Sequence, residues 1–166
     1  MNRRSLFLPL LVLLLAGCDP ARKAAADAAP ASGPASEAAA VPLFDTFGDL
    51  HRDVGTSVPD AQRYFDQGLR MAYGFNHEAA GRSFAEAARL DPQCAMCVWG
   101  QALVLGPNIN LPMDPEAAKD ATALAARAAS LAAHARQADR ALIQALQARY
   151  ADPAPEDRTP LDRAYA

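Results

Sequence analysis

The 166-residue sequence is poor in the features that mark several large classes of protein. Positive charge is scarce, because 16 Lys and Arg face 19 Asp and Glu and the formal net charge is −3. Phosphate binding needs a basic face, so this balance excludes a nucleic-acid-binding domain driven by bulk charge. Strand-forming residues are sparse, and after residue 17 no apolar run is long enough to cross a bilayer.

Motifs of common catalytic sites are also missing. The sequence has no glycine-rich phosphate loop, and its Ser, His and Asp residues form no arrangement that spacing alone would support. We therefore expect neither enzymatic activity nor a cofactor. In an alternative interpretation, the chain is the accessory end of a larger enzyme whose catalytic part lies beyond Ala166.

What the sequence has instead is alanine, which makes up roughly a quarter of its residues. Alanine favours helix and adds little buried area. With few strand formers, this composition predicts an all-α fold with a modest core. The length corresponds to about one domain.

The first 17 residues have the parts of a signal peptide: Arg3 and Arg4 at the start, then a short apolar stretch over residues 6–15. The sequence Leu15-Ala16-Gly17-Cys18 resembles the bacterial lipobox, in which the cysteine receives lipid. We expect lipidation at Cys18 and a membrane-anchored protein that faces the periplasm. The alternative is an ordinary signal peptide with a chance cysteine. Asp19 resembles the inner-membrane retention signal of enterobacterial lipoproteins.

Residues 18–40 are rich in Ala, Pro, Ser and Gly and have no large apolar residue, which predicts a disordered tether. Residues 41–58 have scattered apolar positions without a clear period, and we expect them to form a leader that packs on the first helix. Over residues 59–166, cap and proline signals predict helices at 59–73, 77–90, 92–105, 115–131 and 136–150, and a short one from 159. Ser57 and Asp60 are expected to form a capping box.

Paired helices at this spacing favour a repeat of about 34 residues. The tetratricopeptide repeat places a bulky aromatic, Gly, Ala, an aromatic, Ala and Pro at fixed offsets. The matching residues here are Tyr64, Gly68, Ala80, Phe84, Ala87 and Pro92. The chain resembles a family of uncharacterised bacterial tetratricopeptide lipoproteins, well over residues 61–92 and more loosely afterwards. The resemblance implies an α-solenoid of antiparallel helix pairs, with the last repeat incomplete.

In such arrays the inner face is lined by the first helix of each repeat. The resemblance implies a peptide-binding face formed by Gln62, Phe65, Leu69, Ala72 and Tyr73, a half-apolar surface for an amphipathic helix or an extended peptide. In the alternative, Phe65 and Leu69 belong to the core or pack on the leader. A second candidate is the stiff polar loop at residues 106–112, either an ordered connector or a binding loop.

Cys94 and Cys97 remain after lipidation of Cys18. Three alternatives stay open: a structural disulfide or buried thiols, a thiol-redox pair, or a metal site that adds His77 and a methionine. The sequence thus predicts an envelope scaffold or assembly factor that binds a protein or peptide. The alternative function is a metal-handling or thiol-redox lipoprotein that uses the cysteine pair.

Overall fold

The computed structural model describes residues 41–166, which contain six α-helices, one short 3₁₀ helix and no strand beyond an isolated bridge. The expected signal peptide, the lipidation site Cys18 with Asp19, and the tether at 18–40 lie outside these residues. The helices are α1 (Pro59–Tyr73), α2 (His77–Leu90), α3 (Ala95–Leu105), α4 (Ala117–Leu131), the 3₁₀ helix η2 (Ala132–His134), α5 (Gln137–Ala148) and α6 (Thr159–Tyr165).

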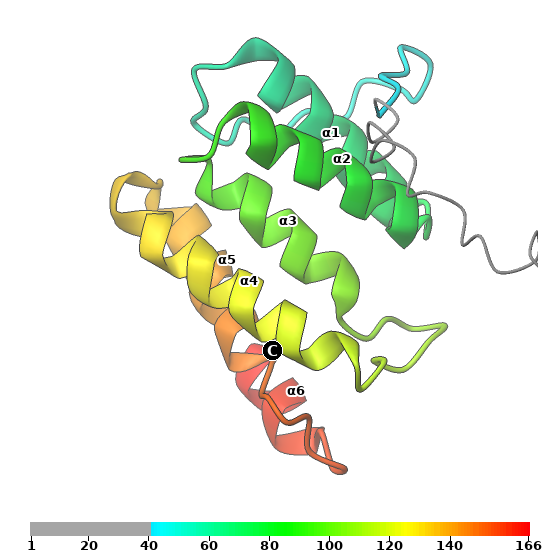
Figure 1. The fold of residues 1–166 in the computed structure, drawn as a ribbon, viewed down its shortest axis with the longest axis vertical. Helices are drawn as coiled ribbons and strands as arrows, with labels where there is room; N and C mark the ends of the chain where they lie inside the picture. Colours follow the sequence, from blue (N-terminus) through cyan, green and yellow to red (C-terminus); the bar gives the residue numbers. More distant parts are fainter. Residues whose placement is uncertain (1–40) are drawn as a thin grey trace, which may run out of the picture. The chain divides into compact units, whose positions relative to one another are not determined.

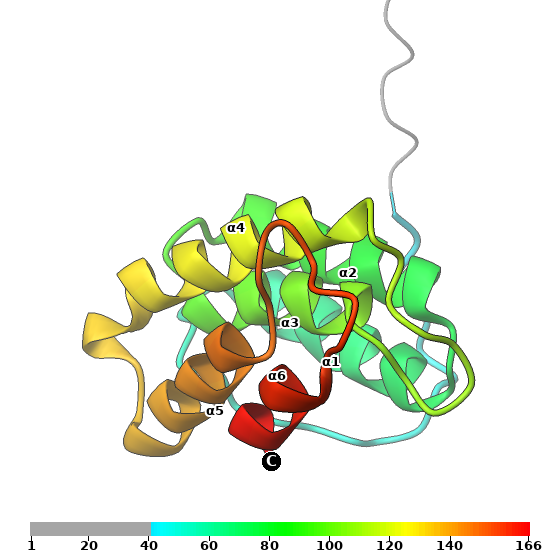
Figure 2. The ribbon, with the colours of Figure 1, turned by 90° about the horizontal axis from the view of Figure 1, so that it is seen from below.

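The described part is therefore all-helical, as the composition predicts. Consecutive helices pack against one another in chain order across the molecule, α1 on α2, α2 on α3, α3 on α4 and α4 on α5 (Figure 1). Three or four residues join α1 to α2 and α2 to α3, whereas residues 106–116 join α3 to α4. Neighbouring helices from α1 to α5 run antiparallel, and α6 adds to the side of α5 (Figure 2). None of the helices in residues 41–166 has both the length and the apolar character that a membrane span requires.

The predicted bounds of the first two helices are confirmed, including the cap at Asn76, whose side chain accepts a hydrogen bond from the Ala79 N–H. The predicted capping box is wrong: Val58 is the N-cap of α1, and no side chain caps that helix. The third helix begins at Ala95 and not at Pro92. The carboxylate of Asp91 instead accepts from the Gln93 N–H and the Thr56 hydroxyl, which holds residues 92–93 in a turn.

The packing of α1, α2 and α3 centres on Phe84, which is fully buried. Its ring lies against Phe65 with centroids 5.4 Å apart. Gly68 on α1 and Gly100 on α3 leave space for this ring, since a Cβ on Gly68 would lie 2.7 Å from it and one on Gly100 closer still. Small residues at these crossings therefore let three helices close around one aromatic side chain.

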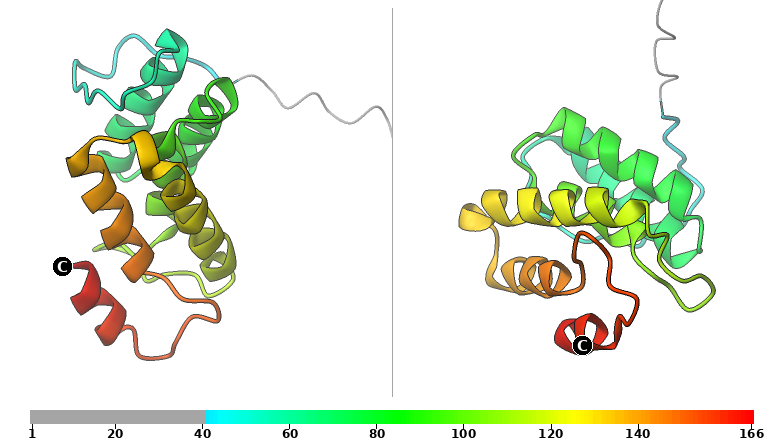
Figure 3. Two further views of the ribbon diagram at one scale, coloured as in Figure 1. Left: turned by 90° about the vertical axis from the view of Figure 1, so that its left-hand side faces the viewer. Right: turned by 60° about the horizontal axis from the view of Figure 1, so that its bottom comes forward.

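The leader, residues 41–58, has no helix or strand and runs beside α1 (Figure 3). Six polar residues of α1 bond to its backbone or side chains: Gln62, Arg63, Tyr64, Asp66, Gln67 and Arg70. Val54 is the only leader residue that reaches the core. The expectation that the leader packs on the first helix is confirmed.

The single tryptophan joins α3 to α5. Trp99 is 7% exposed, and its indole N–H donates to the Leu142 carbonyl at 3.2 Å. Ile143 and Leu146 of α5 are buried in the same core. This contact links α3 directly to α5, beside the packing of α4 on α3.

Candidate binding site at one end of the helices

Several chain segments meet at one end of the helical array. They are the end of α1, the turn at 74–76, the start of α2, the α3–α4 loop at 106–113 and the end of α5. The antiparallel order of the helices brings these segments together, because α1, α3 and α5 end where α2 and α4 begin. We refer to this region as the open end.

The open end carries an unusual share of exposed apolar side chains. Tyr73 is 71% exposed, Phe75 57%, Ile109 89% and Leu111 64%. Burying large apolar side chains is favourable, so a group of them left in water marks an interaction surface. The backbone of Phe75 has a positive φ of 59°, a conformation that non-glycine residues seldom adopt.

His77 and Asn108 connect the α3–α4 loop to the start of α2. The Asn108 amide oxygen accepts the Asn110 N–H at 2.9 Å, so the amide NH₂ is the group that faces His77 Nδ1 at 3.2 Å. Nδ1 must then act as the acceptor, which places the imidazole proton on Nε2. An isolated bridge between Asn108 and Leu111 closes the loop, with Ile109 at its tip.

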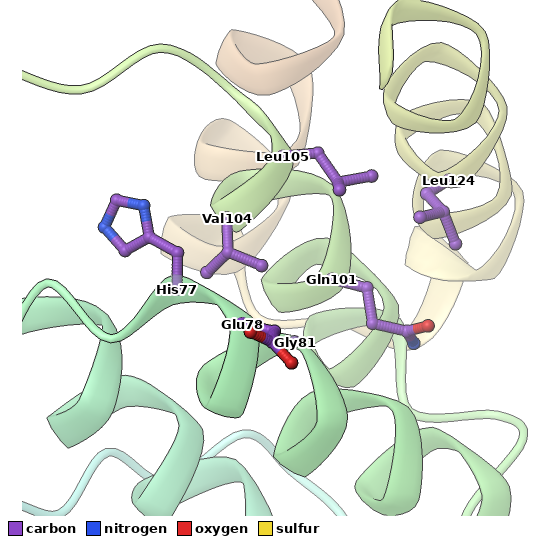
Figure 4. Close-up of a pocket in the computed structure, with 7 residues that line it drawn as sticks. All are labelled: His77, Glu78, Gly81, Gln101, Val104, Leu105 and Leu124. Carbon is purple, nitrogen blue, oxygen red and sulfur yellow. The ribbon is translucent and has the colours of Figure 1, made fainter. Parts of the chain in front are cut away.

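His77 borders three hollows at this end of the molecule. The first, of about 420 Å³, lies between α2, α3 and α4 and is lined mainly by Gly81, Val104, Leu105 and Leu124. Figure 4 shows His77 at one border of this hollow and Leu124 of α4 across from it. The second lies against α1 and the end of α5, and the third lies beside the loop and Phe75. The imidazole thus stands at the centre of the open end.

Arg149 gives the second hollow a cationic wall. Its Nη2 donates to the Pro107 carbonyl at 2.7 Å, and its guanidinium carbon lies 4.4 Å from the centre of the Tyr165 ring. Next to it, the Tyr150 hydroxyl donates to the Ala102 carbonyl, which lies in the last turn of α3. Burial raises the pKa of Tyr150 to about 12. These bonds fix the end of α5 on the end of α3.

The residues that the sequence assigns to a peptide-binding face on α1 are not exposed together as one surface. Phe65 and Leu69 are buried, at 0% and 5% exposure, because they pack in the core with Phe84, so the core alternative describes them correctly. Gln62 is occupied by hydrogen bonds to the leader backbone. Ala72 is partly buried, and Tyr73 alone of this set stands well out into solvent.

The sequence reasoning missed Phe75, Ile109 and Leu111 as surface residues. The signal closest to them is the proline-stiffened loop at 106–112, which the sequence offers as a binding loop. In that loop Ile109 and Leu111 are flanked by asparagine or proline, residues typical of exposed turns. The sequence could therefore have predicted that both side chains face solvent.

Cys94 and Cys97 are joined by a disulfide at the start of α3, and both residues are buried. This burial withholds their sulfur atoms from an attacking thiol, so nothing here favours a redox site. His77 cannot join them as a metal ligand: it lies at the opposite end of α2, about 20 Å away at 1.5 Å per residue. Within residues 41–166 no three His, Cys, Asp or Glu residues are grouped as metal ligands.

A polar cluster that the sequence did not predict ties the leader to the helices. His51 Nδ1 lies 2.7 Å from Asp66, and Arg52 pairs at 2.5 Å with Asp139, which is 1% exposed. Both carboxylates have further partners, since Asp66 accepts the Arg52 N–H and Asp139 also pairs with Arg136. Fully bonded carboxylates of this kind are structural, and no nucleophile lies among these partners.

Comparison of the chain with protein-family models, with curated proteins and with solved structures gives no match.

Proposed function

We propose that the protein is a membrane-anchored scaffold or assembly factor of the bacterial envelope, built from tetratricopeptide-type helix pairs. Its open end binds a segment of a partner protein. The expected lipid on Cys18 attaches the protein to the membrane, and the expected tether holds the helices away from it.

The observation that carries this proposal is the group of exposed apolar side chains at the open end, Tyr73, Phe75, Ile109 and Leu111. They project from the turn before α2 and from the α3–α4 loop, next to hollows that His77, Asn108 and Arg149 border. Aromatic and aliphatic anchors beside a few polar groups form the usual composition of a protein interface. The partner segment that fits is an amphipathic helix or an extended peptide.

The packing of the helices also supports the proposal. Phe84 lies between Gly68 and Gly100, which is how small and aromatic residues are used where paired helices cross closely. A stack of this type gives a rigid frame on which turns and loops at one end can hold a constant geometry.

The test is crosslinking of the full-length protein in native membranes, followed by affinity purification and mass spectrometry. We compare the wild type with the double variant Ile109→Asp and Leu111→Asp. The two wild-type side chains are so exposed that their replacement should leave the fold intact. Leu142→Asp on α5 is the control for an added charge elsewhere, because Leu142 is 36% exposed and lies outside the open end.

We expect one abundant partner whose yield falls about tenfold or more in the double variant. The reason is that the Ile109 and Leu111 side chains each contribute on the order of 1–2 kcal/mol to binding when the partner buries them. The control should retain the partner. An equal yield from the double variant and the wild type would reject the open end as the binding site.

A further inference from the structure

The first ten residues of the leader, 41–50, are held differently from the next four. We call residues 41–50 the flap and residues 51–54 the anchor. The anchor includes the buried Val54 and the ion pair of Arg52 with Asp139. The flap has no buried residue, and the rings of Phe44 and Phe47 are 42% and 43% exposed.

The flap is bound mainly through its backbone. The Gln67 side chain accepts the Phe44 N–H at 2.8 Å and donates to the Pro42 carbonyl at 2.9 Å. The carbonyl of one residue and the N–H of the second residue after it lie on the same edge of an extended chain, so one amide side chain can bind both. Gln67 is itself 1% exposed, and its NH₂ also donates to Ser83, which fixes its orientation.

Gln62 makes the same pair of bonds to the anchor. It donates to the Arg52 carbonyl at 2.8 Å and accepts the Val54 N–H at 3.1 Å. Helix α1 therefore binds extended backbone twice, with two glutamines five residues apart. Neither contact depends on the identity of the side chain that it clamps, apart from the need for an N–H.

The flap side chains alternate as they would on one strand of a sheet. Val41 and Leu43 are half-buried, whereas Pro42 and Phe44 are exposed. The two more buried side chains, Val41 and Leu43, supply apolar contact beside the Gln67 clamp, whereas the Phe44 ring lies against Phe47 of the flap itself, with centroids 5.1 Å apart. The flap makes three further polar contacts with α1. The Tyr64 hydroxyl donates to the Val41 carbonyl at 2.7 Å, and Arg70 donates to the Leu50 carbonyl. Asp45 forms an exposed ion pair with Arg63, which has little strength in water.

We propose that α1 carries an extended-peptide site centred on Gln67, which lies beside the open end but is built from other residues, and that the flap is its resident occupant. A partner segment that displaces the flap needs apolar side chains at two alternate positions. It also needs a free carbonyl at the place of Pro42 and a non-proline residue at the place of Phe44. The anchor stays bound during the exchange, because its ion pair and Val54 do not belong to the site.

The test measures binding of a fluorescent synthetic peptide with the sequence of residues 41–50 to the full chain. The Leu43→Asp variant weakens the resident flap, and Leu50→Asp is the matched control at an exposed flap position. We expect Leu43→Asp to bind the added peptide about tenfold more tightly than the wild type does, and Leu50→Asp to resemble the wild type.

A second peptide carries an N-methyl group on the Phe44 nitrogen, which removes the N–H that Gln67 accepts. We expect its affinity for Leu43→Asp to fall about threefold to tenfold. Equal binding of the two peptides, or no binding of either to a folded Leu43→Asp variant, would overturn the proposal.

Hydrogen exchange of the unmodified protein gives an independent check. Opening of the flap without the anchor requires residues 41–50 to exchange at least about tenfold faster than residues 51–54. Equal protection of the two stretches would show that the leader opens only as a whole, and the flap would then not be exchangeable. The flap reaches the edge of the open end, because Phe47 shares a hollow with Gly74 and Asn76. Neither experiment changes Tyr73, Phe75, Ile109 or Leu111, so failure here leaves the proposed function untouched.

Discussion

At the scale of single residues, the helix crossings depend on one ring and two glycines. Phe84 is fully buried, and the positions where Gly68 and Gly100 would carry a Cβ lie within contact distance of its ring. An added methyl group at either glycine has to displace Phe84 or the backbone of a neighbouring helix. Close packing on Phe84 therefore explains why α1 and α3 each contain a glycine, although glycine inside a helix costs up to about 1 kcal/mol of stability relative to alanine.

We predict that Gly100→Ala lowers the free energy of unfolding by about 1–3 kcal/mol, because overpacking outweighs the gain in helix propensity. Gly81→Ala is the matched control. It also lies within a helix, but its Cβ would meet only Val104, at an ordinary 3.5 Å, and we expect it to be neutral or stabilising. Urea unfolding monitored by circular dichroism measures both, and equal stability of the two variants would refute the packing argument.

The raised pKa of Tyr150 predicts that the free energy of unfolding decreases at alkaline pH. Burial raises its pKa to about 12, above the value near 10 of an unfolded tyrosine. Between about pH 10 and 12 the unfolded chain loses this proton and the folded chain keeps it. The stability contributed by the neutral hydroxyl is fully present below pH 10 and is lost as the pH rises to 12, at a cost of roughly 2 kcal/mol.

Tyr150→Phe should abolish this alkaline loss and should cost about 1 kcal/mol at neutral pH, because the Ala102 carbonyl loses its donor. Tyr73→Phe, at a position that is 71% exposed, serves as the control and should change neither quantity. The measurement is urea unfolding at a series of pH values. If Tyr150→Phe loses as much stability at alkaline pH as the wild type does, groups other than Tyr150 would be responsible for that loss.

At the scale of elements, the leader acts as a strap between the first and fifth helices. Arg52 reaches from the leader to Asp139 at the start of α5, and Arg136 pairs with Asp139 and with Asp53 of the leader. Segments more than 80 residues apart in sequence are thereby joined. The strap covers the side of α1 that no preceding helix among the described residues covers.

We predict a coupling free energy of about 1 kcal/mol between Arg52 and Asp139 in a double-mutant cycle with Arg52→Met and Asp139→Asn. Asp139 is almost fully buried, so its attraction to Arg52 is less screened than that of a surface pair. The exposed pair of Arg63 with Asp60 is the control and should give about 0.5 kcal/mol or less. The same coupling in both cycles would argue against the strap.

The helices themselves could be predicted well from local signals. Asn76 caps α2 as expected, and the ends of α1 and α2 lie where Gly74 and Asp91 suggest. The prediction fails where a side chain that a local pattern assigns to a helix cap bonds to a residue from another part of the chain. Asp91 looks like the cap of a helix that starts at Pro92, but its carboxylate also receives the Thr56 hydroxyl from the leader, a contact that no local pattern contains.

At the scale of the whole molecule, the composition was sufficient to predict the all-helical fold of residues 41–166, but the site was not predictable in the same way. Phe65 and Tyr73 lie on the same helix, and the sequence assigns both to one face. Phe65 is fully buried and Tyr73 is 71% exposed. Which of them meets solvent depends on where α2, α3 and the leader pack, and that information is spread over the whole chain.

The position of the one tryptophan also gives the molecule a built-in optical reporter. Trp99 donates its indole N–H to α5 and is nearly shielded from water, so its emission should shift to longer wavelength when α3 and α5 separate. No other tryptophan in the sequence contributes to the signal. Emission that stays constant while a partner binds would locate the event away from this junction, and a red shift would show that the helices themselves had spread apart.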